Sequence, residues 1–115
     1  MAVNPRACLV IESDGATATE SLVVTRPFRL YDAHGVVRVQ GNAGNTTAIN
    51  RQTAGGGFQP AATPMATTGA VGALVRCTII QVAQEDFIAA DGFQFANTGG
   101  DTTGRLLGYA SILPR

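Results

Sequence analysis

The stretch Glu20–Gln40, ESLVVTRPFRLYDAHGVVRVQ, contains the pattern that decides the fold. Apolar and polar residues alternate over short runs, so that Leu22 and Val24 share one face of an extended chain. An alternation with a period of two residues is typical of β-strands that bury one face. Pro27 has no amide hydrogen and therefore separates the first run from the second. The stretch predicts three short strands, at 20–25, 28–32 and 36–40.

The rest of the chain repeats this rhythm, with Gly, Thr, Asn and Pro between short runs of β-branched and aromatic residues. Further strands are predicted at 7–12, 46–51, 74–81, 93–95 and 105–113. The last of these is apolar on both faces, which is expected of a strand that is central in a sandwich or covered by a second subunit. Val82–Asp86 lacks Gly and Pro and is predicted to form one helical turn. Seven or eight short strands without a long helix predict an all-β fold, a β-sandwich or jelly roll.

A length of 115 residues suits a single domain. We expect residues 1–19 to be an N-terminal arm and residues 20–115 to be the sandwich domain. The segment Thr53–Gly72 is built mostly from Gly, Ala, Thr and Pro, and it is predicted to be a long loop with room for a short strand near Ala61–Ala66. It is either a contact loop or a plain connection. Isolated apolar residues in the arm and the loop are the candidate interface residues, namely Leu9, Val10, Ile11 and Phe58.

The charges of the chain argue against nucleic acid as a partner. Eight arginines balance eight carboxylates, there is no lysine, and the formal net charge is zero. A nucleic-acid-binding protein normally carries a clear basic excess. Arginine without lysine reflects either the composition of the genome or ion pairs at an interface, which suit the guanidinium group. A surface of low charge also does little to repel copies of itself, as expected of a protein that assembles.

The search for catalytic or metal-binding residues is negative. His34 is the only histidine, and with Asp32 alone it cannot build a zinc site. Glu85 and Asp86 are expected to be solvated surface residues. The glycine run at 55–57 is followed by no lysine that could reach a phosphate. The sequence therefore predicts no enzyme, no metal, no cofactor and no small-molecule substrate.

The two cysteines, Cys8 and Cys77, lack the spacing of a metal or redox motif. They are either two buried thiols or one disulfide that ties the arm to the body, and the sequence leaves both alternatives open. Leu9–Ile11 is too short for the apolar core of a signal peptide, and no apolar run approaches the roughly 18 residues that span a membrane. We expect a soluble chain made in the cytoplasm, without a membrane partner.

Taken in order, seven segments resemble the small head-decoration (cement) proteins of tailed bacteriophages. These segments are Thr25–Asp32, Val36–Gly41, Thr46–Arg51, Val75–Ile79, the turn at Val82–Asp86, Ala90–Gly92 leading into Phe93–Phe95, and a last apolar strand that ends at Leu113-Pro114. The resemblance covers residues 20–115 and implies a β-sandwich or jelly-roll body. It also implies a virion protein on the capsid surface, commonly a homotrimer, that bridges major capsid subunits and has no catalytic residues. The alternative function is a receptor- or glycan-binding module of a phage tail fibre.

Overall fold

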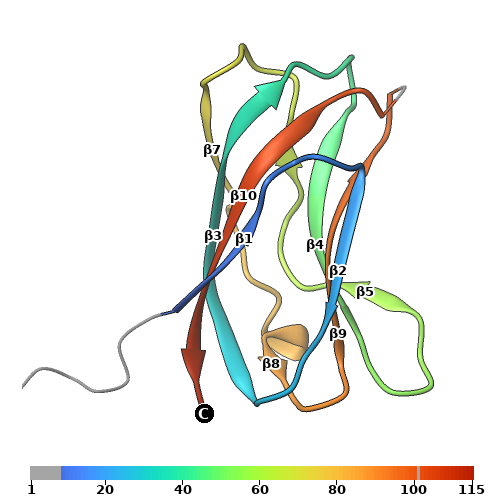
Figure 1. Ribbon diagram of the computed structural model, residues 1–115, viewed down its shortest axis with the longest axis vertical. Coiled ribbons are helices and arrows are strands. Elements are labelled where there is room, and N and C mark those ends of the chain that lie inside the picture. Colours follow the sequence, from blue (N-terminus) through green and yellow to red (C-terminus); the bar gives the residue numbers. More distant parts are fainter. Residues whose placement is uncertain (1–8, 101) are drawn as a thin grey trace, which may run out of the picture.

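The computed structural model describes residues 9–100 and 102–115, and it shows two antiparallel β-sheets packed face to face (Figure 1). Sheet A contains, in spatial order, β1 (Leu9–Ser13), β10 (Arg105–Pro114), β3 (Phe28–Val39) and β7 (Leu74–Arg76), with β8 (Asp86–Phe87) also paired to β3. Sheet B contains β2 (Thr19–Val23), β9 (Gly92–Thr98), β4 (Thr46–Gln52) and β5 (Phe58–Pro60), with β6 (Met65–Ala66) also paired to β4. One turn of 3-10 helix, η1 (Val82–Gln84), precedes β8. The predicted all-β sandwich is confirmed.

The core between the sheets is built around four phenylalanines. Phe28 stacks on Phe87 with ring centroids 4.8 Å apart, and Phe93 contacts both Phe87 and Phe95 at 5.4 and 5.3 Å. Such offset and edge-to-face pairs add stabilisation beyond the burial of the rings. Apolar residues of the other strands, such as Ile49 on β4, belong to the same buried cluster. The period-two pattern thus placed most of the core correctly.

Strand β3 is one strand of 12 residues where the sequence predicted two. Gly35, in the middle of β3, lies opposite Gly108 on β10. A Cβ atom on Gly108 would come within 2.7 Å of Cε1 of Phe95, and one on Gly35 within 2.5 Å of Cδ2 of Leu106. The glycine pair leaves room for core side chains and does not break the strand. The predicted break at 33–35 was therefore wrong.

The segment Thr53–Gly72, predicted to be a long loop, contains two short strands. Both β5 and β6 pair with β4, and the β6 strand agrees with the predicted short strand near Ala61–Ala66. Ala61, Ala62 and Met65 are buried in the core. The segment is therefore packed along most of its length. The strand predicted at 74–81 is shorter, because β7 ends at Arg76 and only an isolated bridge joins Ile80 to Ala62.

Two clusters of buried polar side chains connect the strands of sheet B. The Asn45 side-chain amide donates to Oδ1 of Asn97 (2.8 Å), and its Oδ1 accepts from the hydroxyl of Thr67. At the other end of the sheet, Nε of Arg51 donates to Oδ2 of Asp91 (2.9 Å). Buried polar groups that satisfy one another specify one arrangement of the strands that carry them. These contacts fix the register between β4 and β9.

The described part of the predicted N-terminal arm, residues 9–19, belongs to the sandwich. Strand β1 pairs with β10 from Leu9↔Ile112 to Ser13↔Gly108, and Ser13 is buried. A short turn connects β1 to β2. The chain crosses from sheet A to sheet B in this turn, because β1 belongs to sheet A and β2 to sheet B. Cys8 and the rest of residues 1–8 lie outside the described residues.

Candidate functional site

Strands β1 and β2 form one side of the sandwich, which we call the β1–β2 side (Figure 1). Each is the terminal strand of its sheet, and within the described residues β1 pairs only with β10 and β2 only with β9. A terminal strand presents backbone amide and carbonyl groups that another chain can pair with. This side is therefore a surface on which a second polypeptide can add.

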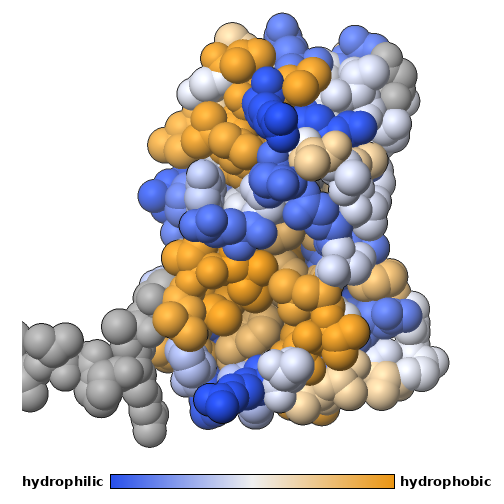
Figure 2. Space-filling view, in the orientation of Figure 1, coloured by the Kyte–Doolittle hydropathy of each residue, from blue (hydrophilic) through white to orange (hydrophobic). Residues whose placement is uncertain are grey.

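An apolar groove of about 60 Å³ runs between the two strands. Its lining includes Phe93 and Phe95, which belong to the core, together with Ile11 from β1 and Leu22 from β2. Figure 2 shows hydrophobic surface over the lower parts of β1 and β2. On this surface Leu22 is 40% exposed and Val23 is 70% exposed. Exposed apolar residues that adjoin a groove are typical of a protein-binding surface.

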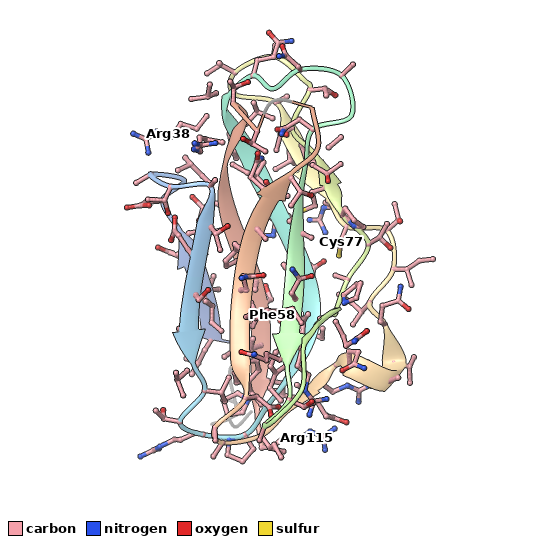
Figure 3. All side chains as sticks on the ribbon, turned by 90° about the vertical axis from the view of Figure 1, so that its right-hand side faces the viewer. Arg38, Phe58, Cys77 and Arg115 are labelled. Carbon is pink, nitrogen blue, oxygen red and sulfur yellow. The ribbon has the colours of Figure 1, made fainter. Side chains whose placement is uncertain are left out.

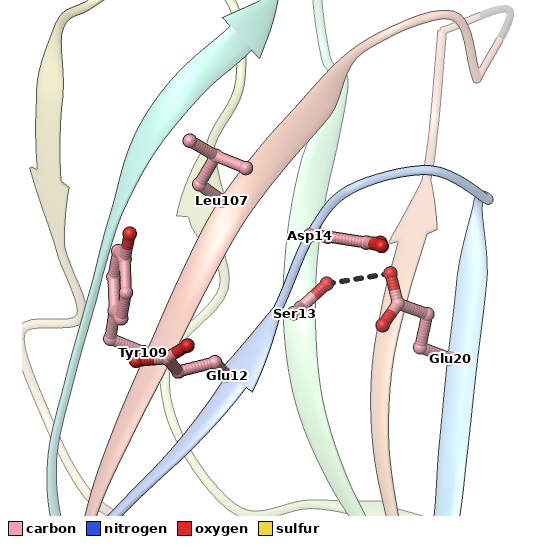
Figure 4. Close-up of a pocket in the computed structure, with 6 residues that line it drawn as sticks. All are labelled: Glu12, Ser13, Asp14, Glu20, Leu107 and Tyr109. Atoms are coloured by element: carbon pink, nitrogen blue, oxygen red, sulfur yellow. Dashed lines mark hydrogen bonds between the residues drawn. The ribbon is translucent and has the colours of Figure 1, made fainter.

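An acidic pocket of about 340 Å³ adjoins this groove. Its lining residues are Glu12, Ser13, Asp14, Glu20, Leu107 and Tyr109 (Figure 4). Glu12 and Glu20 line both the pocket and the groove. The hydroxyl of Ser13 donates to Oε1 of Glu20 at 2.9 Å, which holds that carboxylate toward the pocket (Figure 4). The β1–β2 side thus combines an apolar groove with a cluster of carboxylates.

The carboxylates of this pocket are those that the rest of the described chain does not neutralise. The four ion pairs among the described residues are Arg29–Glu85, Arg51–Asp91, Arg76–Asp32 and Arg115–Asp86. The other three carboxylate side chains among the described residues, those of Glu12, Asp14 and Glu20, all line the acidic pocket. A hydrogen bond from the Ala16 amide is the main reason that the pKa of Asp14 lies below its usual value. Asp14 is therefore ionised at neutral pH.

One positive group stands next to the pocket in the same molecule. Nη1 of Arg38 donates to the backbone carbonyl of Asp14 at 2.8 Å, and Arg38 lies beside the turn between β1 and β2 (Figure 3). Its charge also helps to lower the pKa of Asp14. One arginine opposite three carboxylates leaves the pocket negative. A guanidinium or ammonium group from a partner is the chemical species that fits it.

The arrangement offers little for catalysis or metal binding. The Ser13 hydroxyl contacts a carboxylate, and the imidazole of His34 instead stacks on Tyr109, with ring centroids 5.2 Å apart. A nucleophilic serine needs a base in hydrogen-bond contact that can take its proton at neutral pH, and a histidine usually fills this role. In the part of the chain that the structure describes, no group of three His, Cys, Asp or Glu side chains could hold a metal ion.

The structure places the predicted interface residues in two different regions. Leu9 and Val10 are exposed on β1, at the β1–β2 side, whereas Ile11 is half-buried against the core. Phe58 is 39% exposed on β5, the terminal strand at the other end of sheet B (Figures 1 and 3). Sequence reasoning missed Val23. The run Leu22-Val23-Val24, which puts apolar residues on both faces of one strand, was the signal for it.

Further exposed apolar residues lie in the segment 71–82, which contains β7, the terminal strand at the opposite edge of sheet A. We call them the β7 strip, and they are Val71, Leu74, Ile79 and Val82, each at least 60% exposed. Cys77, a free thiol in the same segment, is half-buried, and burial raises its pKa. A thiol of raised pKa is mostly protonated at neutral pH, and the protonated form is a weak nucleophile. The strip itself is apolar and exposed, as protein-binding surfaces often are.

The acidic residues predicted to be solvated are ion-paired. Oε1 of Glu85 contacts Nη2 of Arg29 at 2.7 Å and its side chain is largely buried, so the prediction for Glu85 was wrong. Asp86 pairs with Arg115, also at 2.7 Å, and its side chain is half exposed. These pairs lie near the β8 end of the sandwich. They connect the segment before β9 to β3 and to the C-terminal end of β10.

Comparison with known proteins gives no match to a family model, to a curated protein or to a solved structure. Within residues 9–100 and 102–115, no helix has the length and apolar character needed to cross a membrane. The functional argument therefore rests on the two apolar surfaces and on the resemblance in sequence.

Proposed function

We propose that this protein is a structural virion protein, a decoration protein that binds the outer surface of a phage head and stabilises the shell. Its partner in this proposal is the major capsid protein. One observation carries the proposal: exposed apolar surfaces lie at opposite edges of sheet A, on the β1–β2 side and on the β7 strip. A protein that bridges subunits needs two separate binding surfaces.

The size of the molecule is compatible with two such contacts. Its accessible surface is 6336 Å². A standard interface buries about 800 Å² on each partner, so each contact would take roughly an eighth of the surface. The two surfaces also differ chemically, since the β1–β2 side adjoins an acidic pocket and the β7 strip consists of apolar residues. Unlike surfaces bind unlike partners, so one of them can bind the capsid while the other binds a different partner.

Co-sedimentation with phage heads tests this proposal. Heads are assembled from the major capsid protein of the same genome, and the purified protein is added over a range of concentrations. We expect saturable binding at a fixed number of copies per head, together with heads that withstand heating to a higher temperature. The double substitution Leu74→Asp/Val82→Asp should abolish this binding, because it places charges in the β7 strip. Heads that bind none of the wild-type protein would refute the proposal.

A glycan-binding module is the second candidate, and a specific observation favours it. Tyr109 and His34 stack on each other in sheet A beside the acidic pocket, and Tyr31 on β3 is 50% exposed. Sugars bind to exposed aromatic rings flanked by carboxylates and other polar groups. A glycan array with hits that disappear on Tyr109→Ala would favour this function over capsid decoration, and an array without hits would count against it.

A further inference from the structure

Arg26 stands out among the arginines of the described residues. Four others form ion pairs with carboxylates of the same molecule. Arg38 donates to the carbonyl of Asp14, and Arg105 donates to the carbonyls of Thr102 and Gly104. Within residues 9–100 and 102–115, Arg26 is exposed and has no hydrogen bond or ion pair. It is the one described cation free to neutralise a carboxylate of another molecule.

Arg26 and the acidic pocket lie toward opposite ends of the same open edge. Glu20 is the second residue of β2, and Arg26 follows the end of β2 by three residues. Val24 still pairs with the β8–β9 turn, through bonds of 2.8 Å to the carbonyl of Asp91 and from the amide of Ala90. Six residues of extended chain span about 20 Å. The edge is thus negative at one end, apolar at Leu22 and Val23 in the middle, and positive at the other end.

A surface with this order of charges is complementary to itself after a two-fold rotation. We propose that the β1–β2 side binds a second copy of this chain, with the β2 strands antiparallel and Arg26 of each copy in the acidic pocket of the other. Antiparallel pairing of the two β2 edges joins both B sheets into one continuous sheet. The apolar middle of each edge then packs on that of its partner. Such an isologous contact is the commonest geometry of protein dimers.

Charge balance supports a second copy as the occupant. The chain has zero net charge, so two copies do not repel each other at long range. The pocket offers three carboxylates to the planar fork of a guanidinium group, which binds carboxylates in a bidentate manner. The contact leaves the β7 strip free at the opposite edge of sheet A, where the proposed capsid contact is placed. The inference concerns self-association and stands whether or not the protein binds capsids.

Sedimentation equilibrium on the full chain tests the contact. We expect the wild-type protein to dimerise, and Arg26→Glu or Glu12→Arg to raise the dimer dissociation constant at least about tenfold, because each change introduces repulsion twice per dimer. The double variant Arg26→Glu/Glu12→Arg pairs residue 26 with an opposite charge at residue 12, although Asp14 and Glu20 keep their charges, and it should recover part of the affinity. Arg76→Glu makes the same change of charge at the other edge of sheet A and should leave the dissociation constant unchanged. Circular dichroism checks that each variant is folded.

Three results would overturn the inference. One is a wild-type protein that stays monomeric at several hundred micromolar. Another is a stable trimer, because an isologous two-fold contact closes as a dimer. The third is a double variant that associates no better than the single variants, because the loss would then not come from the pairing of Arg26 with the pocket. A monomer that still binds phage heads would sink this inference and leave the proposed function intact.

Discussion

Replacing Asp91 by alanine removes the buried partner of Arg51, and we expect the free energy of unfolding to fall by about 3–5 kcal/mol. The Asp91 side chain is 2% exposed and accepts from Nε of Arg51 and from the backbone amide of Ile88, both at 2.9 Å. The Arg51 side chain is 12% exposed and lies over the ring of Phe87, at 5.6 Å from its centroid. A guanidinium group cannot lose its proton in a protein, so Asp91→Ala leaves a charge buried without a counter-charge.

Chemical denaturation with urea measures this loss. For a domain of this size the slope is about 1–2 kcal/mol per M, so the midpoint should fall by roughly 1.5–5 M. The variant Arg51→Met removes the charge and keeps an apolar side chain against Phe87. The double variant Arg51→Met/Asp91→Ala should therefore be more stable than the sum of the single losses predicts, by about 1–3 kcal/mol. A loss below about 1 kcal/mol for Asp91→Ala, or strictly additive effects, would refute this reasoning.

Three further predictions concern other parts of the molecule. Gly108→Ala should cost about 1–3 kcal/mol in urea unfolding, since its Cβ would meet the Phe95 ring at 2.7 Å, and Phe95→Leu in the same chain should recover part of this loss. In a Cys8→Ser background, Cys77 should react with a thiol reagent at least about tenfold more slowly than in urea, because burial raises its pKa and keeps it protonated. Equal rates of reaction in the folded and the unfolded protein would contradict this prediction. The stabilisation linked to the Cys77 thiol is complete below the pKa of the unfolded thiol, and it is lost as the pH rises through the pKa of the folded thiol. Leu22→Asp should weaken self-association while stability, measured by thermal unfolding, changes little; unchanged association would contradict it.

Most of the strands and their inward faces could be predicted from the sequence, because a period of two residues is a local property. Ile49, which alternates with more polar neighbours on β4, is buried as this pattern predicts. Strand β10 is apolar on both faces, so the pattern did not decide which of its faces enters the core. Strand β3 was predicted as two pieces, at 28–32 and 36–40, and the residues between them, which include Gly35, were left out of both. In the sheet Gly35 makes room for Leu106, and this depends on which strand lies opposite.

The candidate site could be predicted only in part, because it depends on how the strands are ordered. Leu22 and Val24 were predicted to share a buried face, but Val24 is 3% exposed and Leu22 is 40% exposed. The difference arises because β2 is the terminal strand of sheet B, so that nothing in the described chain covers its outer edge. Glu12 and Glu20 line one pocket because their strands end different sheets on the same side of the sandwich. Spacing along the chain does not contain this information.

Hydrogen–deuterium exchange of the protein, free and bound to phage heads, tests the central claim most directly. We predict that binding slows exchange in residues 71–82, which contain the β7 strip, and leaves the already paired strand β4 unchanged. Residues 19–26 should be protected in the free protein when its concentration is raised above the dissociation constant of the dimer. Binding to heads without a change in residues 71–82 would contradict the account of two separate apolar surfaces with different partners.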